Sequence, residues 1–164
     1  MTHESRRPDF AALSTGQTVA TRTVELSRED LVRYAGVSGD TNPIHWNQDF
    51  ATAVGLPNVI AHGMLTMGIA MQAVVDWAGD PAAVVDCQSR FTKPVVVPNV
   101  FDTRMRASTA LTIVATVGAL DDAARTARID LTVTAPDLSA ADVDPHTAAP
   151  LKVLTKAQAV VACV

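Results

Sequence analysis

The chain has 164 residues, of which 48% are hydrophobic and 18% charged, and its 13 Lys and Arg against 17 Asp and Glu give a formal net charge of −4. This length and apolar content predict one globular domain with a sizeable core rather than a disordered chain. The negative charge, without any run of basic residues, argues against a nucleic-acid-binding protein. No stretch is long and apolar enough to span a bilayer.

Two features favour a cytoplasmic location. The N-terminal residues are polar and include no hydrophobic region of the kind that a secretory signal requires. Cys87 and Cys163 lie far apart in apolar surroundings and have no metal-ligand spacing. We therefore expect two small buried thiols in a reducing compartment.

The first part of the chain predicts a tail, a strand and a short helix. Residues 1–16 are expected to form an N-terminal tail, and residues 17–164 a single domain. The β-branched run 17–26 predicts a strand. Ser27 is placed to cap a following helix, with Asp30 at the third position, as in a capping box.

Two more helices are expected before the strands resume. Asn47 is placed to cap a short helix over residues 48–54. Residues 64–78 carry apolar side chains on almost every helical face, which predicts a helix buried in the core. Gln72 and Asp76 within it argue against a membrane span.

The second half of the chain predicts a run of strands. They are expected over residues 83–97, interrupted by Pro94, then 110–120, 127–134 and 151–164, with a bend near Lys156 and a loop at 136–150. One long apolar helix among strands indicates an α+β fold, in which an antiparallel sheet of five or six strands wraps the helix and short extra helices precede it. Its exposed edges favour pairing with another subunit.

The most informative stretch is the turn that carries Asp40 and His45. Pro43 removes a backbone donor and keeps Asn42 out of the helical region, while Gly39 tolerates positive φ. A rigid, irregular turn of this kind can aim a carboxylate and an imidazole into one space, which suits proton transfer. The alternative is that Asp40 only caps the turn and that His45 is a surface histidine.

The start of the long helix is a second candidate site. It follows Ala61-His62-Gly63, where no Ser, Thr, Asp or Asn occupies the cap position. The first amides of the helix then lack a side-chain acceptor and can bind an anion or a developing oxyanion. Water is the alternative partner for these amides. For His62 we expect a structural role rather than that of a ligand or second base.

Three segments carry a resemblance to a known family. Residues 34–51, with Ser38-Gly39-Asp40-x-Asn42-Pro43-Ile44-His45, resemble the motif of the MaoC-like, or (R)-specific enoyl-CoA hydratase 2, family. Residues 31–46, 60–69 and 90–95 are most similar to the catalytic (beta) subunits of the (3R)-hydroxyacyl-ACP dehydratases of type II fatty-acid (mycolic acid) elongation.

The resemblance implies a hotdog fold, in which a sheet wraps one long helix, and a homodimer or a heterodimer with a related subunit. It implies that Asp40 and His45 are catalytic, that the Gly63 N–H holds a thioester carbonyl, and that Gly39, Asn42 and Pro43 support the turn. The implied reaction interconverts trans-2-enoyl and (3R)-3-hydroxyacyl thioesters of CoA or an acyl carrier protein (ACP), without a cofactor or metal.

Four questions stay open from the sequence. The same scaffold can support an acyl thioesterase or a non-catalytic acyl-binding partner subunit. A metal site formed by Asp40, His45 and His62 is a weaker alternative. The carrier can be CoA or ACP, and four cations offer either a patch for it or an ordinary solvated face: Arg90, Lys93, Arg104 and Arg106.

Overall fold

The computed structural model describes residues 7–99, 107–140 and 143–164. Its elements, in chain order, are η1 (Phe10–Ala12), β1 (Thr18–Leu26), α1 (Arg28–Ser38), η2 (Pro43–His45), α2 (Gln48–Ala53), α3 (Gly63–Ala78), η3 (Pro81–Ala83), β2 (Val84–Phe91), β3 (Thr109–Asp121), β4 (Thr126–Pro136), β5 (Pro150–Lys152) and β6 (Leu154–Ala162).

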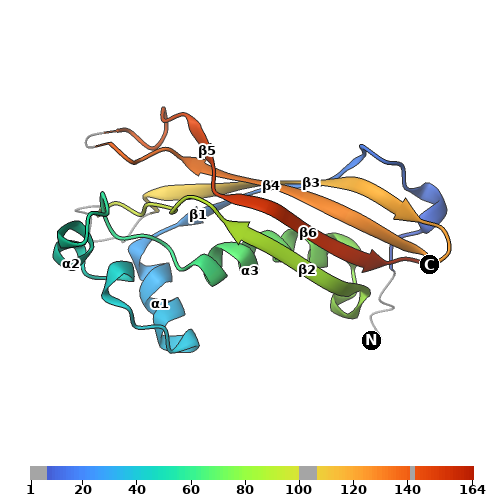
Figure 1. Ribbon diagram of the computed structural model, residues 1–164, viewed down its shortest axis with the longest axis horizontal. Helices are drawn as coiled ribbons and strands as arrows, with labels where there is room; N and C mark the ends of the chain where they lie inside the picture. The colour runs from blue at the N-terminus through green and yellow to red at the C-terminus, as the bar shows by residue number, and fades with distance from the viewer. Residues whose placement is uncertain (1–6, 100–106, 141–142) are drawn as a thin grey trace.

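The strands form one antiparallel sheet, and the helices α1, α2 and α3 lie on one side of it (Figure 1). The order across the sheet is β1-β3-β4-β6-β2, with β5 paired to the end of β4. β1 and β2 are therefore the two edges of this path. A six-stranded antiparallel sheet around one long helix, with short helices before it, confirms the α+β hotdog prediction.

The core lies between the sheet and one face of α3. Side chains along β3 and β4 alternate, because successive residues of a strand point to opposite faces. The buried set includes Ile113, Val117, Ile129 and Val133. α3 meets these side chains with small residues, Ala70, Ala73, Val74 and Ala78, all at most 3% exposed. Small side chains let the helix axis lie close to the sheet.

The prediction that α3 is buried on nearly every side is wrong for the described chain. One stripe of the helix is exposed, at positions four residues apart: Met64, Gly68, Gln72 and Asp76. Met64 is an apolar side chain that keeps 59% of its surface exposed. The correction has a physical reason, because the sheet covers a single side of the helix and nothing in the described residues covers the other.

The strand predicted over residues 83–97 ends earlier, at Phe91. Pro94 lacks a backbone donor, and the chain beyond Phe91 leaves the ladder with β6. It turns instead toward residues 59–61, where the Ala61 N–H donates to the Val95 carbonyl (2.8 Å) and the Val97 N–H to the Val59 carbonyl (2.9 Å). These two hydrogen bonds position residues 59–61, which lead into α3.

Of three smaller expectations, the structure contradicts two and confirms one. Residues 10–12, within the expected tail, form η1, and Phe10 is 6% exposed with its N–H bonded to the Val164 carbonyl. Cys87 was expected to be buried but is exposed on the edge strand β2. The bend near Lys156 is confirmed, because that residue has a φ of 49° opposite a register shift in β2.

Among the described residues, no helix combines the length and the apolar character that a membrane crossing needs.

Gly39 and Gly36 give a matched test of how α1 ends. Gly39 has a φ of 75° and a free space where a Cβ would stand, so Gly39→Ala should cost about 1 kcal/mol of unfolding free energy through backbone strain alone. Gly36 lies inside the helix with equal space, and Gly36→Ala should add roughly 0.5–1 kcal/mol. Urea denaturation measures both; equal effects of the two substitutions would contradict this account.

Candidate active site

The turn after α1 is held by a series of short side-chain bonds to the backbone. α1 begins at a capping box of Ser27 and Asp30 and ends at Gly39. Asp40 Oδ1 accepts from the Asn42 N–H, and Asn42 Oδ1 accepts from the Ile44 N–H, both at 3.2 Å. Successive turns of this type replace helix bonds. They start η2 at Pro43 and so fix the spacing of Asp40 and His45.

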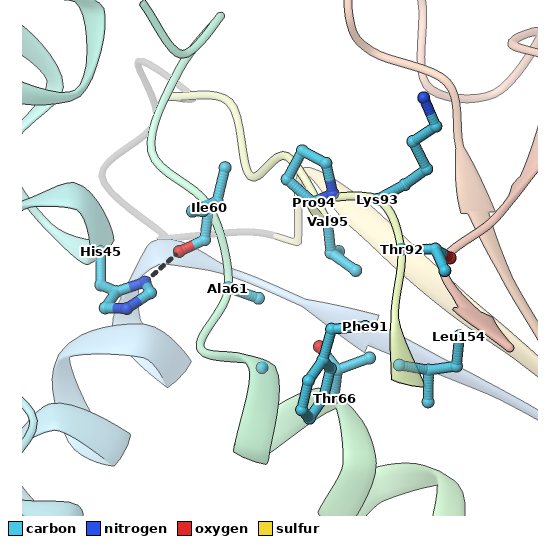
Figure 2. A pocket seen from close by; sticks show the side chains of 11 residues that line it. His45, Ile60, Ala61, Thr66, Phe91, Thr92, Lys93, Pro94, Val95 and Leu154 are labelled. Carbon is cyan, nitrogen blue, oxygen red and sulfur yellow. Dashed lines mark hydrogen bonds between the residues drawn. The ribbon is translucent and has the colours of Figure 1, made fainter. Parts of the chain in front are cut away.

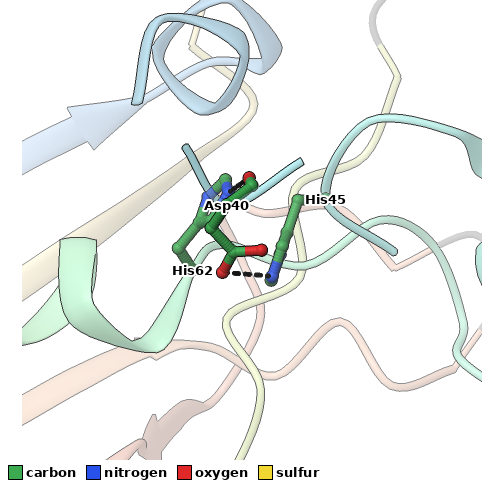
Figure 3. A group of neighbouring side chains, drawn as sticks. All are labelled: Asp40, His45 and His62. Atoms are coloured by element: carbon green, nitrogen blue, oxygen red, sulfur yellow. Dashed lines mark hydrogen bonds and ion pairs between the residues drawn. The ribbon is translucent and has the colours of Figure 1, made fainter. Parts of the chain in front are cut away.

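His45 is buried, with 7% of its surface exposed, which contradicts the alternative of a surface histidine. Its Nδ1 lies 2.7 Å from the Ile60 carbonyl oxygen. Because a carbonyl only accepts, Nδ1 carries the proton of the neutral ring and Nε2 keeps its lone pair. Nε2 lies 3.8 Å from Asp40 Oδ2 (Figure 3). The pair predicted from the sequence therefore meets in space.

The two members of the pair have different surroundings. The side chain of Asp40 is 53% exposed, against 8% for that of His45. Among the described residues, the carboxylate of Asp40 accepts a hydrogen bond only from the Asn42 N–H of its own turn. In such an arrangement, the exposed carboxylate can exchange a proton with water, and the sheltered imidazole can take a proton from a bound carbon acid.

His62 is the most deeply buried polar residue of the site, at 1% exposed. Its Nε2 lies 3.0 Å from the Asp40 carbonyl oxygen, and its ring stacks on His45 with 3.7 Å between centroids. The ring of Tyr34 also packs against the ring of His62, with 4.9 Å between centroids. Burial lowers the pKa of His62 from its ordinary 6.5, with a further lowering from His45 that the Asp40 contacts partly oppose. His62 is therefore neutral at pH 7.

Gly63 is the first residue of α3, and the cap residue His62 makes no side-chain bond to the helix amides. A pocket of about 290 Å³ opens at this helix end (Figure 2). Its lining includes His45, Gly63, Thr66, Phe91, Lys93 and Leu154. A Cβ built on Gly63 would stand 3.2 Å from the Phe91 ring. Any larger residue at this position would therefore require the Phe91 ring to shift by a few tenths of an ångström.

The structure thus brings together His45 and Gly63 in one pocket wall, with Asp40 against His45 but not in the lining. The roles of the Ile60 carbonyl and of Phe91 could not be predicted from the sequence, because neither residue lies at a spacing from the motif that indicates contact. Of the four cations considered above, Lys93 lines the pocket, although its amine points away from it (Figure 2). Arg104 and Arg106 lie outside the described residues.

A metal site at Asp40, His45 and His62 remains a weaker alternative. One ligand atom from each lies within 4.8 Å of the others. The two rings, however, stack with 23° between their planes. The lone pairs of imidazole lie in the ring plane, so stacked rings direct them side by side rather than toward one point. Tetrahedral or octahedral coordination needs them to converge.

Comparison with known proteins shows the family. The MaoC like domain matches residues 10–121, more than half of the chain. The peroxisomal enoyl-CoA hydratase 2 of Arabidopsis thaliana is 41% identical over 61 residues, which cover 36% of this chain and 20% of that protein. The (R)-specific enoyl-CoA hydratase of Rhodospirillum rubrum is 36% identical over 87 residues, covering 52% and 60%.

Solved structures agree with this result. A protein described as a MaoC-like dehydratase has a TM-score of 0.78 and 34% identity, covering 96% of this chain but 43% of its own. A chain of the ChsH1-ChsH2 complex from Mycobacterium tuberculosis has a TM-score of 0.65 over 92% of this chain and 98% of its own. At 17% identity, that likeness shows the fold alone.

The chain therefore belongs to the MaoC-like domain family, whose similar members include enoyl-CoA hydratases and 3-hydroxyacyl-thioester dehydratases. The matched regions span from a fifth to three fifths of the first curated relatives.

Proposed function

We propose that this chain catalyses the reversible hydration of trans-2-enoyl thioesters to (3R)-3-hydroxyacyl thioesters in fatty-acid metabolism. The observation that carries the proposal is the 3.8 Å approach of Asp40 Oδ2 to His45 Nε2, beside a pocket that begins at the uncapped start of α3. The family and the names of the similar proteins support the same reaction class.

Dehydration requires a base for the weakly acidic C2 proton and an acid for the 3-hydroxyl group. Neutral His45, with its Nδ1 proton held by the Ile60 carbonyl, presents the Nε2 lone pair to the C2 proton. Protonated Asp40 gives its proton to the departing hydroxyl, which leaves as water. In hydration, Asp40 takes a proton from water as its oxygen attacks C3, and protonated His45 returns a proton to C2.

Negative charge gathers on the thioester oxygen as C2 loses its proton. The Gly63 N–H, at the positive end of α3, is the donor we assign to that oxygen. A single donor of this kind contributes roughly 3–4 kcal/mol in the transition state. The helix end thus completes a site in which acid, base and oxyanion donor each come from a different part of residues 40–63.

We also propose that the site works beside a second hotdog subunit. Half of the Asp40 side chain is exposed, α3 exposes Met64, and the edge strand β2 exposes Val85 at 59%. The similar MaoC-like dehydratase is more than twice as long as the part this chain covers, and ChsH1-ChsH2 is a complex of two chains. In this protein, the second subunit would be a copy of this chain or a related chain, placed over the surface that exposes Asp40, Met64 and Val85.

Within the family we favour a role as the catalytic subunit of a (3R)-hydroxyacyl-ACP dehydratase of type II fatty-acid elongation. The likeness of residues 31–46, 60–69 and 90–95 supports it. A 3-hydroxyacyl-thioester dehydratase of Mycobacterium tuberculosis is 47% identical over 66 residues. Activity on matched CoA and ACP thioesters of several chain lengths, with and without a related subunit, tests this choice. Equal or higher kcat/KM on the CoA thioesters would contradict it.

Asp40→Asn and His45→Gln test the two proton-transfer roles. Each keeps the size of the side chain but removes its acid or base function, so each should lower kcat by about 10²–10⁴-fold. The fall in enoyl absorbance with crotonyl-CoA measures hydration, and free thiol release separates a thioesterase. Wild-type rates in either variant would refute the assignment, and a loss of wild-type activity in EDTA would favour the metal site.

Gly63→Pro tests the oxyanion donor. Proline is tolerated at the first position of a helix, where it removes the N–H and adds a ring that includes a Cβ, and the ψ of 133° at His62 suits a residue before proline. We expect kcat to fall by about 10²–10³-fold with the fold retained. Gly63→Ala is the matched control: it keeps the N–H, displaces the Phe91 ring slightly and should lose less than tenfold. Equal losses would show that bulk, not the donor, matters.

Val85→Glu tests the subunit contact. A charge on the open edge of β2 should dissociate the assembly and lower activity, because like charges would face each other across a paired edge. Val37→Glu, at an 88% exposed position of α1, is the control and should change neither. Light scattering gives the mass and should report at least twice 17.3 kDa for an active wild-type assembly. A fully active monomer would contradict the proposal.

A further inference from the structure

His62 contacts every part of the candidate site. Its ring lies on the ring of His45, its Nε2 lies against the backbone of Asp40, and its own backbone precedes Gly63 as the cap residue of α3. Its carbonyl accepts the Thr66 N–H at 3.1 Å, the first bond of the helix. One side chain therefore lies at the junction of the two segments that supply acid, base and oxyanion donor (Figure 3).

The contact with Asp40 fixes the tautomer of His62. The Asp40 carbonyl oxygen can only accept, so the 3.0 Å contact places a proton on Nε2. This bond holds the main chain of Asp40, whose carboxylate is half exposed and is otherwise bonded only to the Asn42 N–H. The main chain at Asp40 is thus anchored to a buried group while its side chain remains free to meet water.

The contact with His45 fixes the plane of that ring. The Ile60 carbonyl holds one edge of His45 at Nδ1, and a single hydrogen bond leaves the ring free to rock about it. The face of His62, 3.7 Å away and inclined by 23°, blocks that motion on one side. Together the two contacts direct the Nε2 lone pair of His45 toward Asp40.

The environment of His62 Nδ1 argues against a role for His62 in packing alone. His62 Nδ1 is buried and finds no hydrogen-bond partner in the described part of the chain. A buried acceptor without a partner costs free energy, and an apolar ring of similar size would avoid that cost. A histidine at this position is therefore explained by the need for a specific donor, the Nε2–H.

From these contacts we infer that His62 is a positioning residue: its Nε2–H anchors Asp40 and its ring aligns His45, so that both reacting groups keep their geometry relative to Gly63. The inference rests on the proposed function. It differs from a second-base role, because the Nε2 proton is engaged with a backbone oxygen and His62 is not among the residues that line the pocket at Gly63. Burial, which keeps the pKa of His62 below its ordinary value, keeps the ring neutral and able to stack.

Two substitutions separate the two contacts. His62→Phe keeps a stacking ring and removes the donor, whereas His62→Gln keeps an N–H donor at the position of Nε2 and removes the ring. We expect His62→Phe to lower kcat by about 10–100-fold and His62→Gln by about tenfold, since loss of an orienting partner typically costs this much. KM should change less than threefold in both. The midpoint of thermal unfolding of His62→Phe should stay unchanged or rise.

The matched control is His146→Phe, the same change at an exposed histidine in the loop between β4 and β5. It should leave kcat, KM and thermal stability as in the wild type. If both His62 variants fold and retain wild-type kcat while Asp40→Asn abolishes activity, the positioning role is refuted and the proposed function stands. If His62→Phe lowers the midpoint of thermal unfolding, and the fraction that remains folded keeps the wild-type kcat and KM, a purely structural role replaces the positioning role.

A measurement on the unaltered protein decides the matter if a variant fails to fold or if no hydratase activity is found. Nitrogen-15 NMR of labelled histidine should show His62 as the neutral Nε2–H form, and His45 as the Nδ1–H form, across neutral pH. A Nδ1–H or charged His62 would overturn the inference. Correct tautomers in a protein without hydratase activity would instead refute the proposed function and leave the positioning geometry intact.

Discussion

The site depends on one junction, between the turn at residues 40–45 and the extended segment 59–62. Three bonds join them: the Ile60 N–H donates to the Ile44 carbonyl, His45 Nδ1 meets the Ile60 carbonyl, and His62 Nε2 meets the Asp40 carbonyl. Because the turn forms only the short helix η2 and no strand, these contacts replace the ladder that a strand would have. Without the junction, Asp40 and His45 would belong to a loop with no fixed relation to α3.

The junction is in turn fixed to the sheet. The segment at 95–97 bonds to 59–61 on its other side, and Arg28, at the start of α1, donates to the Val97 carbonyl at 2.6 Å and to Asn58. The end of β2 at Phe91 supports the junction, because a strand that continued past Pro94 would have run beside residues 150–153 and left 59–61 unsupported. The catalytic proposal therefore depends on residues some fifty positions beyond the motif in the chain.

The sequence predicted local features well and the relations between distant segments poorly. The capping box at Ser27 and the irregular turn that contains Gly39 and Pro43 follow from backbone preferences of a few neighbouring residues, and the structure confirms both. The exposure of Cys87 and the open stripe of α3 were mispredicted, since both depend on where the sheet stops covering its surroundings. The stacking of His62 on His45 joins residues 17 positions apart and leaves no periodic pattern.

The contrast in exposure between Asp40 and His45 also supports the proposed second subunit. A base that removes a proton from carbon benefits from exclusion of water, and His45 has that shelter within this chain. Asp40 does not, because more than half of its side chain faces solvent on the side where no described residue covers it. A second subunit placed over this side would raise the strength of every charge interaction at the pair by lowering the local dielectric. In the proposed reaction, the shelter of His45 is thus encoded in this chain, whereas the proposed second subunit would supply the shelter of Asp40.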